Sequence, residues 1–598
     1  MTSTSTTLPQ WDMTMVYPGL SSPEFEGGFR AMTEDVERLA RLWDERGVDA
    51  SPSSTIDEKT VGAFDEVVAA YNAVLKSSST LYVYVYSFVA TDSRDDLAQA
   101  RQSELQQQMV KLSQLGARFV AWIGSLDVEA LITRSSMAAA HAYMLRKAAA
   151  QAAHLMSPAE EALADELALT GPTAWSKLYY SFTSQLAVPV DIEGETQSLP
   201  MSAIRNLAHD ADRAARARAY DAEIAAWTGA ALPIAAALNA IKGQINTLTA
   251  KRGWASPLDA ALFGNNIDRA TLDAMMEATH DSFPDFRRYL AIKARALGVE
   301  KMAWYDLFAP VGSLDESWDW EDAERFIVTQ FGGFGPKMRA LAERAFHERW
   351  IDAGPRPGKR DGAFCIHLRD GESRVLANYS PTFDAVSTLA HELGHAYHNL
   401  NLAARTPLQR STPMTLAETA STFCETIVTQ AGMRQATPQG RLALLDASLQ
   451  GACQIVVDIT SRFLFESRLF EMRQKRDLSI DDLNALMLDA QRETYGDGLD
   501  GRVLHPYMWA VKSHYYSSSF YNYPYMFGQL FGLGLYAQYE ADPASFVARY
   551  DDLLSSTGLD DAATLAARFD IDVRAPAFWT KSLDVIRRDI DAFDALVP

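Results

Sequence analysis

Apolar residues recur at three- and four-residue spacing over most of the chain, in stretches rich in Ala, Leu, Glu, Arg and Gln. This period matches one face of an α-helix, so the pattern predicts a mainly α fold. A strong helix start is expected at Ser157, because Ser157, Pro158 and Glu160 have the residue types and spacing of a capped first turn. The clearest of the other helical stretches are residues 30–46, 96–122, 127–155, 211–227 and 441–473.

Residues 361–380 depart from this pattern. Two β-leaning runs there flank a turn-forming Arg-Asp-Gly at 369–371, which predicts a hairpin or a small sheet. A weaker break near 189–200 divides the chain into an N-terminal helical region, 1–195, and a second region, 196–598, that carries the candidate chemistry. A chain of 598 residues is long enough for such a multi-lobed body.

Composition narrows the classes of partner. The chain has 77 acidic and 55 basic residues, and its formal net charge of −22 disfavours nucleic acid and anionic membranes. Three cysteines without CxxC spacing indicate reduced thiols. The Ser/Thr-rich N-terminus lacks a basic start and an apolar core, and apolar runs such as 231–241 are shorter than the roughly 18 residues of a membrane span. We therefore expect a cytoplasmic protein.

A metal-binding motif follows the predicted hairpin. His391 and His395, in the sequence HELGH, are four residues apart, so on a helix both imidazoles reach one ion. Glu392 points about 100° away from His391, close enough to contact a metal-bound water. Ser380-Pro381 is the expected helix opening, and Asp384 in the first turn suits the helix dipole.

A catalytic zinc site needs a third protein ligand. The segment TLAETASTFCETI supplies Glu418 and Glu425, which are seven residues apart and therefore lie on one face of a second helix. Either carboxylate could reach the ion. We favour Glu418 as the ligand and Glu425 as an acceptor that orients a histidine; the alternative for Glu425 is a solvated charge on the helix surface.

The sequence resembles the M3 metallopeptidases, and most closely their oligoendopeptidase F branch. The resemblance rests on residues 157–179, 378–398 and 417–421 and on the histidine-tyrosine run after residue 514. It implies zinc held by His391, His395 and Glu418, one ion per chain, with Glu392 as the general base. It also implies a helical body of the gluzincin kind, split by a deep channel with zinc on its floor.

Residues 512–528 combine His514 with tyrosines at 515, 516, 521, 523 and 525. Phenol and imidazole groups beside zinc suit the oxyanion of peptide hydrolysis, although such rings also serve as core or wall. The resemblance assigns His514, Tyr521 and Tyr525 to this role, with Tyr523 as the alternative. The sequence departs from the mammalian branch at Gly528, where that branch has a further tyrosine.

These residues predict a zinc-dependent oligopeptidase that hydrolyses internal bonds of short peptides. Zinc would activate water while Glu392 takes its proton and delivers it to the leaving amine. The predicted hairpin could bind an extended peptide as an added strand.

One alternative is a gluzincin carboxydipeptidase that releases C-terminal dipeptides. Another is a helical binding protein with a dead site, which the intact ligands and base argue against. The sequence does not indicate an oligomeric state.

Overall fold

The computed structural model describes residues 8–49, 56–192, 194–312 and 317–598, so the first seven Ser/Thr-rich residues lie outside it. The chain divides into two compact units that alternate along the sequence. Unit 1 comprises Met1–Leu155, Ser317–Val428 and Gln538–Phe569, and unit 2 comprises Met156–Glu316, Thr429–Ala537 and Asp570–Pro598. Each unit is therefore assembled from three segments, and the region boundary at residue 195 stays a prediction.

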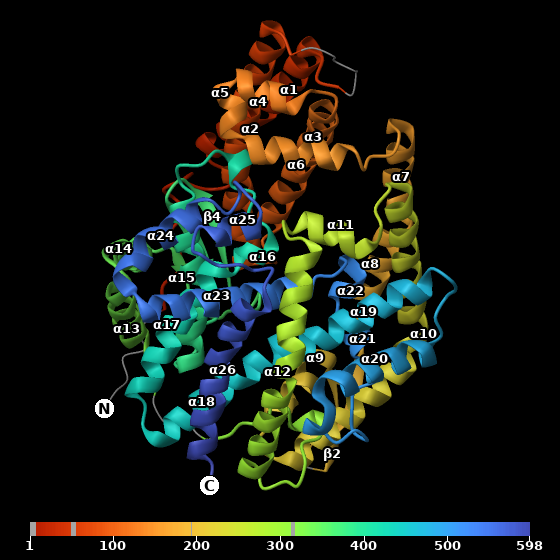
Figure 1. Cartoon of the computed structure of the whole chain (residues 1–598), viewed down its shortest axis with the longest axis vertical. Coiled ribbons are helices and arrows are strands. Elements are labelled where there is room, and N and C mark those ends of the chain that lie inside the picture. Colours follow the sequence, from red (N-terminus) through yellow and green to blue (C-terminus); the bar gives the residue numbers. More distant parts are fainter. Residues whose placement is uncertain (1–7, 50–55, 193, 313–316) are drawn as a thin grey trace. The chain divides into compact units, whose positions relative to one another are not determined.

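Unit 1 consists of helices and one small sheet (Figure 1). Its N-terminal helices are α1 (Pro23–Arg46), α2 (Glu58–Thr91), α3 (Asp96–Gly124), α4 (Val128–Arg134), α5 (Ser136–Ala140) and α6 (Ala142–Ala152). Its other elements are α13 (Trp320–Phe334), α14 (Pro336–His347), β3 (Ile351–Asp352), β4 (Phe364–Arg369), β5 (Glu372–Leu376), α15 (Phe383–Asn401), α16 (Met414–Ala417), most of α17 (Thr419–Gln435), α24 (Pro543–Ser555) and α25 (Ala562–Ala567).

The sheet of unit 1 has the order β3-β5-β4. Strands β4 and β5 pair antiparallel around the predicted turn, where Gly371 has a φ of 74°, and β3 adds a short parallel pairing to β5. The predicted hairpin is therefore confirmed. A continuous core joins the N-terminal helices, and Leu368 of β4 is buried in it. This packing fixes one end of β4 against α2.

Unit 2 is also mainly helical and includes a second hairpin that the sequence pattern did not predict. Its strands, β1 (Ala187–Ile192) and β2 (Glu195–Pro200), pair antiparallel where only a break was expected. The helices of unit 2 are α7 (Pro158–Thr170), α8 (Pro172–Thr183), α9 (Met201–Asn206), α10 (Arg213–Lys251), α11 (Pro257–Gly264), α12 (Arg269–Ala296), α18 (Pro438–Cys453), α19 (Ile459–Arg473), α20 (Ile480–Tyr495), α21 (Met508–Val511), α22 (His514–Ser517), most of α23 (Tyr523–Ala541) and α26 (Pro576–Leu596).

Helix ends follow the expected capping chemistry. Ser157 accepts a hydrogen bond from the Glu160 backbone while the Glu160 carboxylate binds the Ser157 backbone, so the predicted capping box of α7 is confirmed. The opening expected at Ser380-Pro381 is wrong by two residues, because Thr382 caps α15 and its hydroxyl accepts from the Ala385 N–H. Asp384 lies in the first turn as predicted.

Two helices of the described chain are long and apolar enough to cross a membrane, by length and composition alone. One is Arg213–Lys251, which contains the run 231–241, and the other is the continuous helix Pro438–Arg473. The expectation that the run at 231–241 is too short for a span is therefore wrong for its helix. The protein itself buries 50% and 56% of the two apolar windows, which is also how core helices behave.

Candidate metal centre and active site

Helix α15 presents both histidines of the HELGH sequence on one side. The ring centroids of His391 and His395 lie 5.0 Å apart, one helical turn from each other. Gly394 permits a second segment to approach this turn, because an added Cβ would lie 2.6 Å from the carbonyl oxygen of Ala420 and 2.6 Å from the Cα of Ser421. The close approach of α15 and α17 therefore depends on a glycine at this position.

Glu418 lies between α16 and α17, directly beside the two histidines. Its Oε2 is 3.3 Å from Nε2 of His391 and 3.5 Å from Nε2 of His395. One ligand atom from each of the three residues lies within 4.8 Å of the others. Ligands about 2.1 Å from a tetrahedral zinc are about 3.4 Å apart, so these donors fit one ion. Ser421 donates a hydrogen bond of 2.8 Å to the same Glu418 oxygen.

Each histidine is oriented through its contacts with neighbouring groups. Nδ1 of His391 lies 2.9 Å from a carboxylate oxygen of Glu425, which leaves Nε2 directed at Glu418. The ring of His395 is hydrogen-bonded to the backbone of Ala417. Contacts of this kind fix the tautomer and the orientation of metal-binding histidines. Glu425 therefore lies where an orienting acceptor was predicted, and its carboxylate is not part of the three-residue group.

The charges of this group suit a cation. Burial opposes the ionised form of Glu418, but its contacts with His391 and His395 prevail and lower its pKa to about 2. Burial lowers the pKa of His395 to about 4, against the opposing effect of Glu418. Metal binding needs an ionised carboxylate and neutral imidazoles, and Glu418 and His395 favour these forms. Burial opposes the charged form of His391, but its hydrogen bonds with Glu418 and Glu425 prevail and raise its pKa, so a bound cation would displace a proton from this ring.

Glu392 is buried in the same cavity. Only 6% of the residue is exposed, and its Oε2 has no hydrogen-bond partner among the described residues. Burial raises the pKa of Glu392 to about 7, which the charge of His391 partly offsets. The backbone of Cys365, on β4, is hydrogen-bonded to the carboxylate. A carboxylate held in this way, with one oxygen unpaired, can accept a proton from a small molecule in the cavity.

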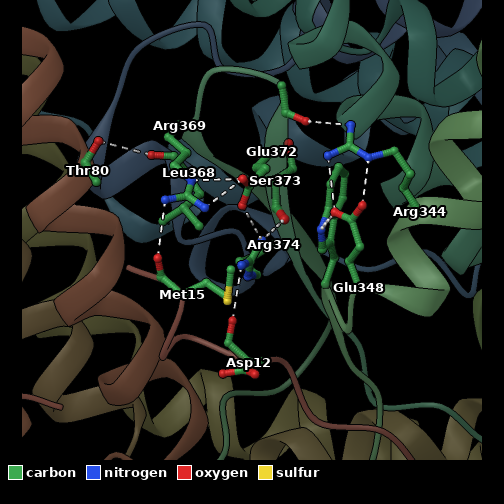
Figure 2. Close-up of polar contacts among 12 residues, drawn as sticks. Asp12, Met15, Thr80, Arg344, Glu348, Leu368, Arg369, Glu372, Ser373 and Arg374 are labelled. Carbon is green, nitrogen blue, oxygen red and sulfur yellow. Dashed lines mark hydrogen bonds and ion pairs between the residues drawn. The ribbon is translucent and has the colours of Figure 1, made fainter. Parts of the chain in front are cut away.

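The cavity beside these residues has a volume of about 660 Å³ and lies within unit 1. One wall is β4, which is the edge strand of its sheet in the described part of the chain. Residues of α2 form another wall, and the Thr80 hydroxyl bonds the Leu368 carbonyl of β4 (Figure 2). Residues of β4 and the candidate metal ligands therefore line the same cavity.

The N-terminal segment and α14 also contact the hairpin (Figure 2). The buried guanidinium of Arg374 donates to the Asp12 carbonyl at 3.1 Å, and Arg369 donates to the Met15 carbonyl at 3.4 Å. Arg344 of α14 donates to the Gly371 carbonyl at 3.3 Å and pairs with Glu348. These contacts give the residues before α1 a role in holding β4 and β5.

His514, Tyr521 and Tyr525 lie together in unit 2. The rings of His514 and Tyr521 stack with centroids 4.9 Å apart, and Tyr525 lies edge-on to Tyr521 at 5.4 Å. Burial and the charges of Arg462 and Lys512 lower the pKa of His514. Tyr523 differs from them, because it is completely buried and its hydroxyl binds the Asn265 amide at 3.1 Å. The three predicted donors are thus brought together with one another, whereas Tyr523 packs in a core.

Comparison with known proteins agrees with this site. The model of peptidase family M3 matches residues 336–585, which contain all the candidate metal ligands and the histidine-tyrosine run. A second model, described as oligopeptidase F, matches residues 123–187. The two matched ranges contain the residues on which the family resemblance in the sequence rests.

Whole-length relatives and solved structures support the same grouping. An oligoendopeptidase F homolog of Lactococcus lactis subsp. lactis is 25% identical over 539 residues, which covers 87% of this chain and 85% of the relative. Oligopeptidase PepF of Bacillus subtilis is 20% identical over 541 residues, which cover 89% of this chain and 81% of the relative. In fold, the chain is similar to a putative peptidase from Chlamydophila abortus, with a TM-score of 0.84, 20% identity and 98% of both chains covered.

A crystal structure of oligoendopeptidase-F from Enterococcus faecium has a TM-score of 0.71 at 18% identity and covers 96% of this chain and 99% of that one. The family models, the relatives and the fold therefore agree with one another and with the ligand geometry. The chain belongs to peptidase family M3, in its oligoendopeptidase F branch, and is a metallopeptidase.

Proposed function

We propose that this protein is a zinc-dependent oligoendopeptidase that hydrolyses internal bonds of short peptides. The observation that carries the proposal is the grouping of His391, His395 and Glu418 within 4.8 Å beside the buried Glu392. Two nitrogen donors and one carboxylate, with room for water, match catalytic zinc sites better than sites for harder cations. One zinc ion per chain is expected.

Bound zinc would act as a Lewis acid toward the scissile carbonyl and would make water more acidic. Glu392 takes the proton of the attacking water on its unpaired Oε2 and then delivers it to the nitrogen of the leaving amine. Glu425 keeps His391 in one orientation throughout the reaction through its contact with Nδ1. The proposal requires no other general base.

His514, Tyr521 and Tyr525 are proposed as hydrogen-bond donors to the carbonyl oxygen as it gains negative charge. Their grouping in unit 2 and the family resemblance support this role. The lowered pKa of His514 keeps its ring neutral at pH 7, and a neutral imidazole still has one N–H to donate. Tyr523 is a weaker candidate, because its hydroxyl is buried against Asn265.

The position of β4 supports a preference for extended substrates. An edge strand beside the candidate metal centre can pair with the backbone of a peptide, and such pairing tolerates many side chains. A folded protein has already committed its backbone groups to its own secondary structure. The names of the Lactococcus and Enterococcus proteins, oligoendopeptidase F, agree with internal cleavage of short peptides.

A library of peptides of about 5 to 20 residues, made with free and with amidated C-termini, tests this function. We expect internal cleavage that 1,10-phenanthroline abolishes and that amidation changes less than about twofold, because no step uses the terminal carboxylate. Mass spectrometry of the products identifies the bonds. Release of C-terminal dipeptides that stops on amidation would instead show a carboxydipeptidase, and digestion of casein into many fragments would contradict the restriction to short peptides.

A further inference from the structure

Unit 2 contains a buried ion pair next to the histidine-tyrosine run. Nζ of Lys242, on α10, lies 2.7 Å from Oε1 of Glu466, on α19, and the two side chains are 0% and 2% exposed. Removing two charges from water is costly, and an ion pair of this kind is often no more stabilising than apolar residues of the same size. Stability alone therefore does not account for this buried pair.

Both members of the pair also bind the segment that connects α22 to α23. Lys242 donates a second hydrogen bond, of 2.8 Å, to the carbonyl of Ser518. The other carboxylate oxygen of Glu466 accepts from the side-chain amide of Asn522 at 2.8 Å. Asn522 in turn accepts from the backbone N–H of Tyr523, at the start of α23. One buried pair thus holds both ends of residues 518–522.

Phe520 lies between these two anchor points in a conformation that needs support. Its φ is 53°, in the left-handed region that residues with a side chain seldom adopt. The ring is buried and stacks on Phe470 at 5.4 Å, with Phe463 at 5.8 Å. Such a backbone persists only where the surrounding structure holds it, and such positions are frequent near functional sites.

The proposed donors are attached to this anchored segment. Tyr521 lies between Phe520 and Asn522, and its ring stacks on that of His514. The N–H and the hydroxyl of Ser518 both donate to the His514 carbonyl at 3.0 Å. The contact of Lys242 with Ser518 and that of Glu466 with Asn522 therefore set the positions of the two rings.

We propose that Lys242, Glu466 and Asn522 are positioning residues that hold His514 and Tyr521 in the geometry needed for turnover. This inference rests on the proposed function of those two donors. The physical reason is that a hydrogen-bond donor stabilises developing charge only if it is already in place, and small displacements of reacting groups are expensive in rate. The three residues need not contact the substrate.

The same unit contains a matched control pair. Nζ of Lys293 lies 3.0 Å from a carboxylate oxygen of Asp446, and these side chains are also 0% and 2% exposed. In the described structure the other side-chain partners of Asp446 are Tyr289 and Gln450, and neither belongs to residues 514–525. Loss of either lysine leaves one buried carboxylate unpaired, so the two variants should lose similar stability.

The experiment compares full-length, zinc-loaded Lys242→Met, Lys293→Met and Asn522→Ala proteins in kcat, KM and Tm. We expect similar falls in Tm for the two lysine variants. Only Lys242→Met and Asn522→Ala should lower kcat, by about tenfold or more, with KM changed less than about twofold. Asn522→Ala leaves the ion pair in place, so it keeps the test decisive if Lys242→Met does not fold. Equal kcat losses in Lys242→Met and Lys293→Met, or a wild-type kcat in Asn522→Ala, would overturn the inference.

A double-mutant cycle separates positioning from general destabilisation. In a His514→Ala/Tyr521→Phe background, Asn522→Ala should change kcat less than about twofold, because the groups it positions are gone. A loss as large as in the wild-type background would refute the inference while leaving the donor role intact. If His514→Ala and Tyr521→Phe each keep a wild-type kcat, the donor role itself fails and the positioning inference fails with it.

Discussion

The candidate metal centre in unit 1 and the histidine-tyrosine group in unit 2 are held in different ways. His391 and His395 lie one turn apart on α15, Glu392 follows His391 directly, and Glu418 immediately precedes α17. His514 instead belongs to the short helix α22, and Tyr521 lies in the irregular segment 518–522, next to a left-handed Phe520. The positions of the two histidines follow from helix geometry, whereas the segment that carries Tyr521 is held by contacts with α10 and α19.

This difference suits the two proposed tasks. Metal ligands must keep distances of about 2 Å to one ion, which side chains on packed helices do best. Donors to a developing charge must meet a substrate that enters and leaves, and loops carry such groups in many enzymes. A loop can place such donors only if its position is fixed before the substrate binds. Residues 518–522 are fixed by the hydrogen bonds of Lys242 and Asn522.

The largest effect is expected from Glu392→Gln. The amide cannot take a proton from water, so kcat should fall by about 10²-fold or more while the zinc content stays near that of wild type. Stopped-flow assays on an internally quenched peptide, together with metal analysis of the same sample, measure both quantities. A Glu392→Gln variant that keeps more than about a tenth of the wild-type rate would show that Glu392 is not the general base.

Loss of one proposed oxyanion donor should cost no more than loss of the base. Either Tyr521→Phe or Tyr525→Phe, or both, should lower kcat by about 10²-fold with KM little changed, because the oxyanion forms only after water attacks. Tyr523→Phe is the matched control, since its buried hydroxyl contacts Asn265. If Tyr523→Phe loses most activity while the other two variants stay near wild type, Tyr523 is the oxyanion donor and the assignment of Tyr521 and Tyr525 is wrong.

The smallest effect should come from the residue that orients His391. Glu425→Gln leaves the three proposed ligands in place but weakens the contact with Nδ1, so zinc affinity should fall by about 10- to 100-fold. Competition with a fluorescent chelator measures it, and Glu418→Ala should lose zinc more severely in the same assay. If Glu425→Ala loses zinc and Glu418→Ala does not, the two carboxylates have exchanged roles.

Much of the metal centre was predictable from local spacing. Residues one turn apart share a helix face, so HELGH placed His391 and His395 together before any tertiary contact was considered. The expectation that Glu418 and Glu425 lie on one face of the same helix is wrong, because Glu418 lies in the turn between α16 and α17 and only Glu425 belongs to α17. The need for Gly394 was not predicted, because it arises from the approach of α17, a partner distant in sequence. A glycine inside a predicted helix is the feature of the sequence that indicates such a close approach.

Features that depend on distant contacts were predicted less well. The sequence predicts only a break at the hairpin of β1 and β2, since β2 is mostly exposed and lacks a clear alternation of apolar residues. Tyr523 is indistinguishable from its neighbouring tyrosines in the sequence, and its complete burial against Asn265 and Phe463 shows that it is a core residue. Long-range partners of this kind leave no periodic signal in one chain.

Zinc titration of the chelator-treated protein tests the central claim most directly, namely that His391, His395 and Glu418 form a one-zinc catalytic centre. The wild-type protein, freed of metal and supplied with increasing zinc, should regain peptide hydrolysis linearly up to one equivalent per chain and then stay constant. Its far-ultraviolet circular dichroism should not change, because the helical units do not depend on one ion. Full hydrolysis by the metal-free protein, or a rate that continues to rise to two equivalents, would contradict the account.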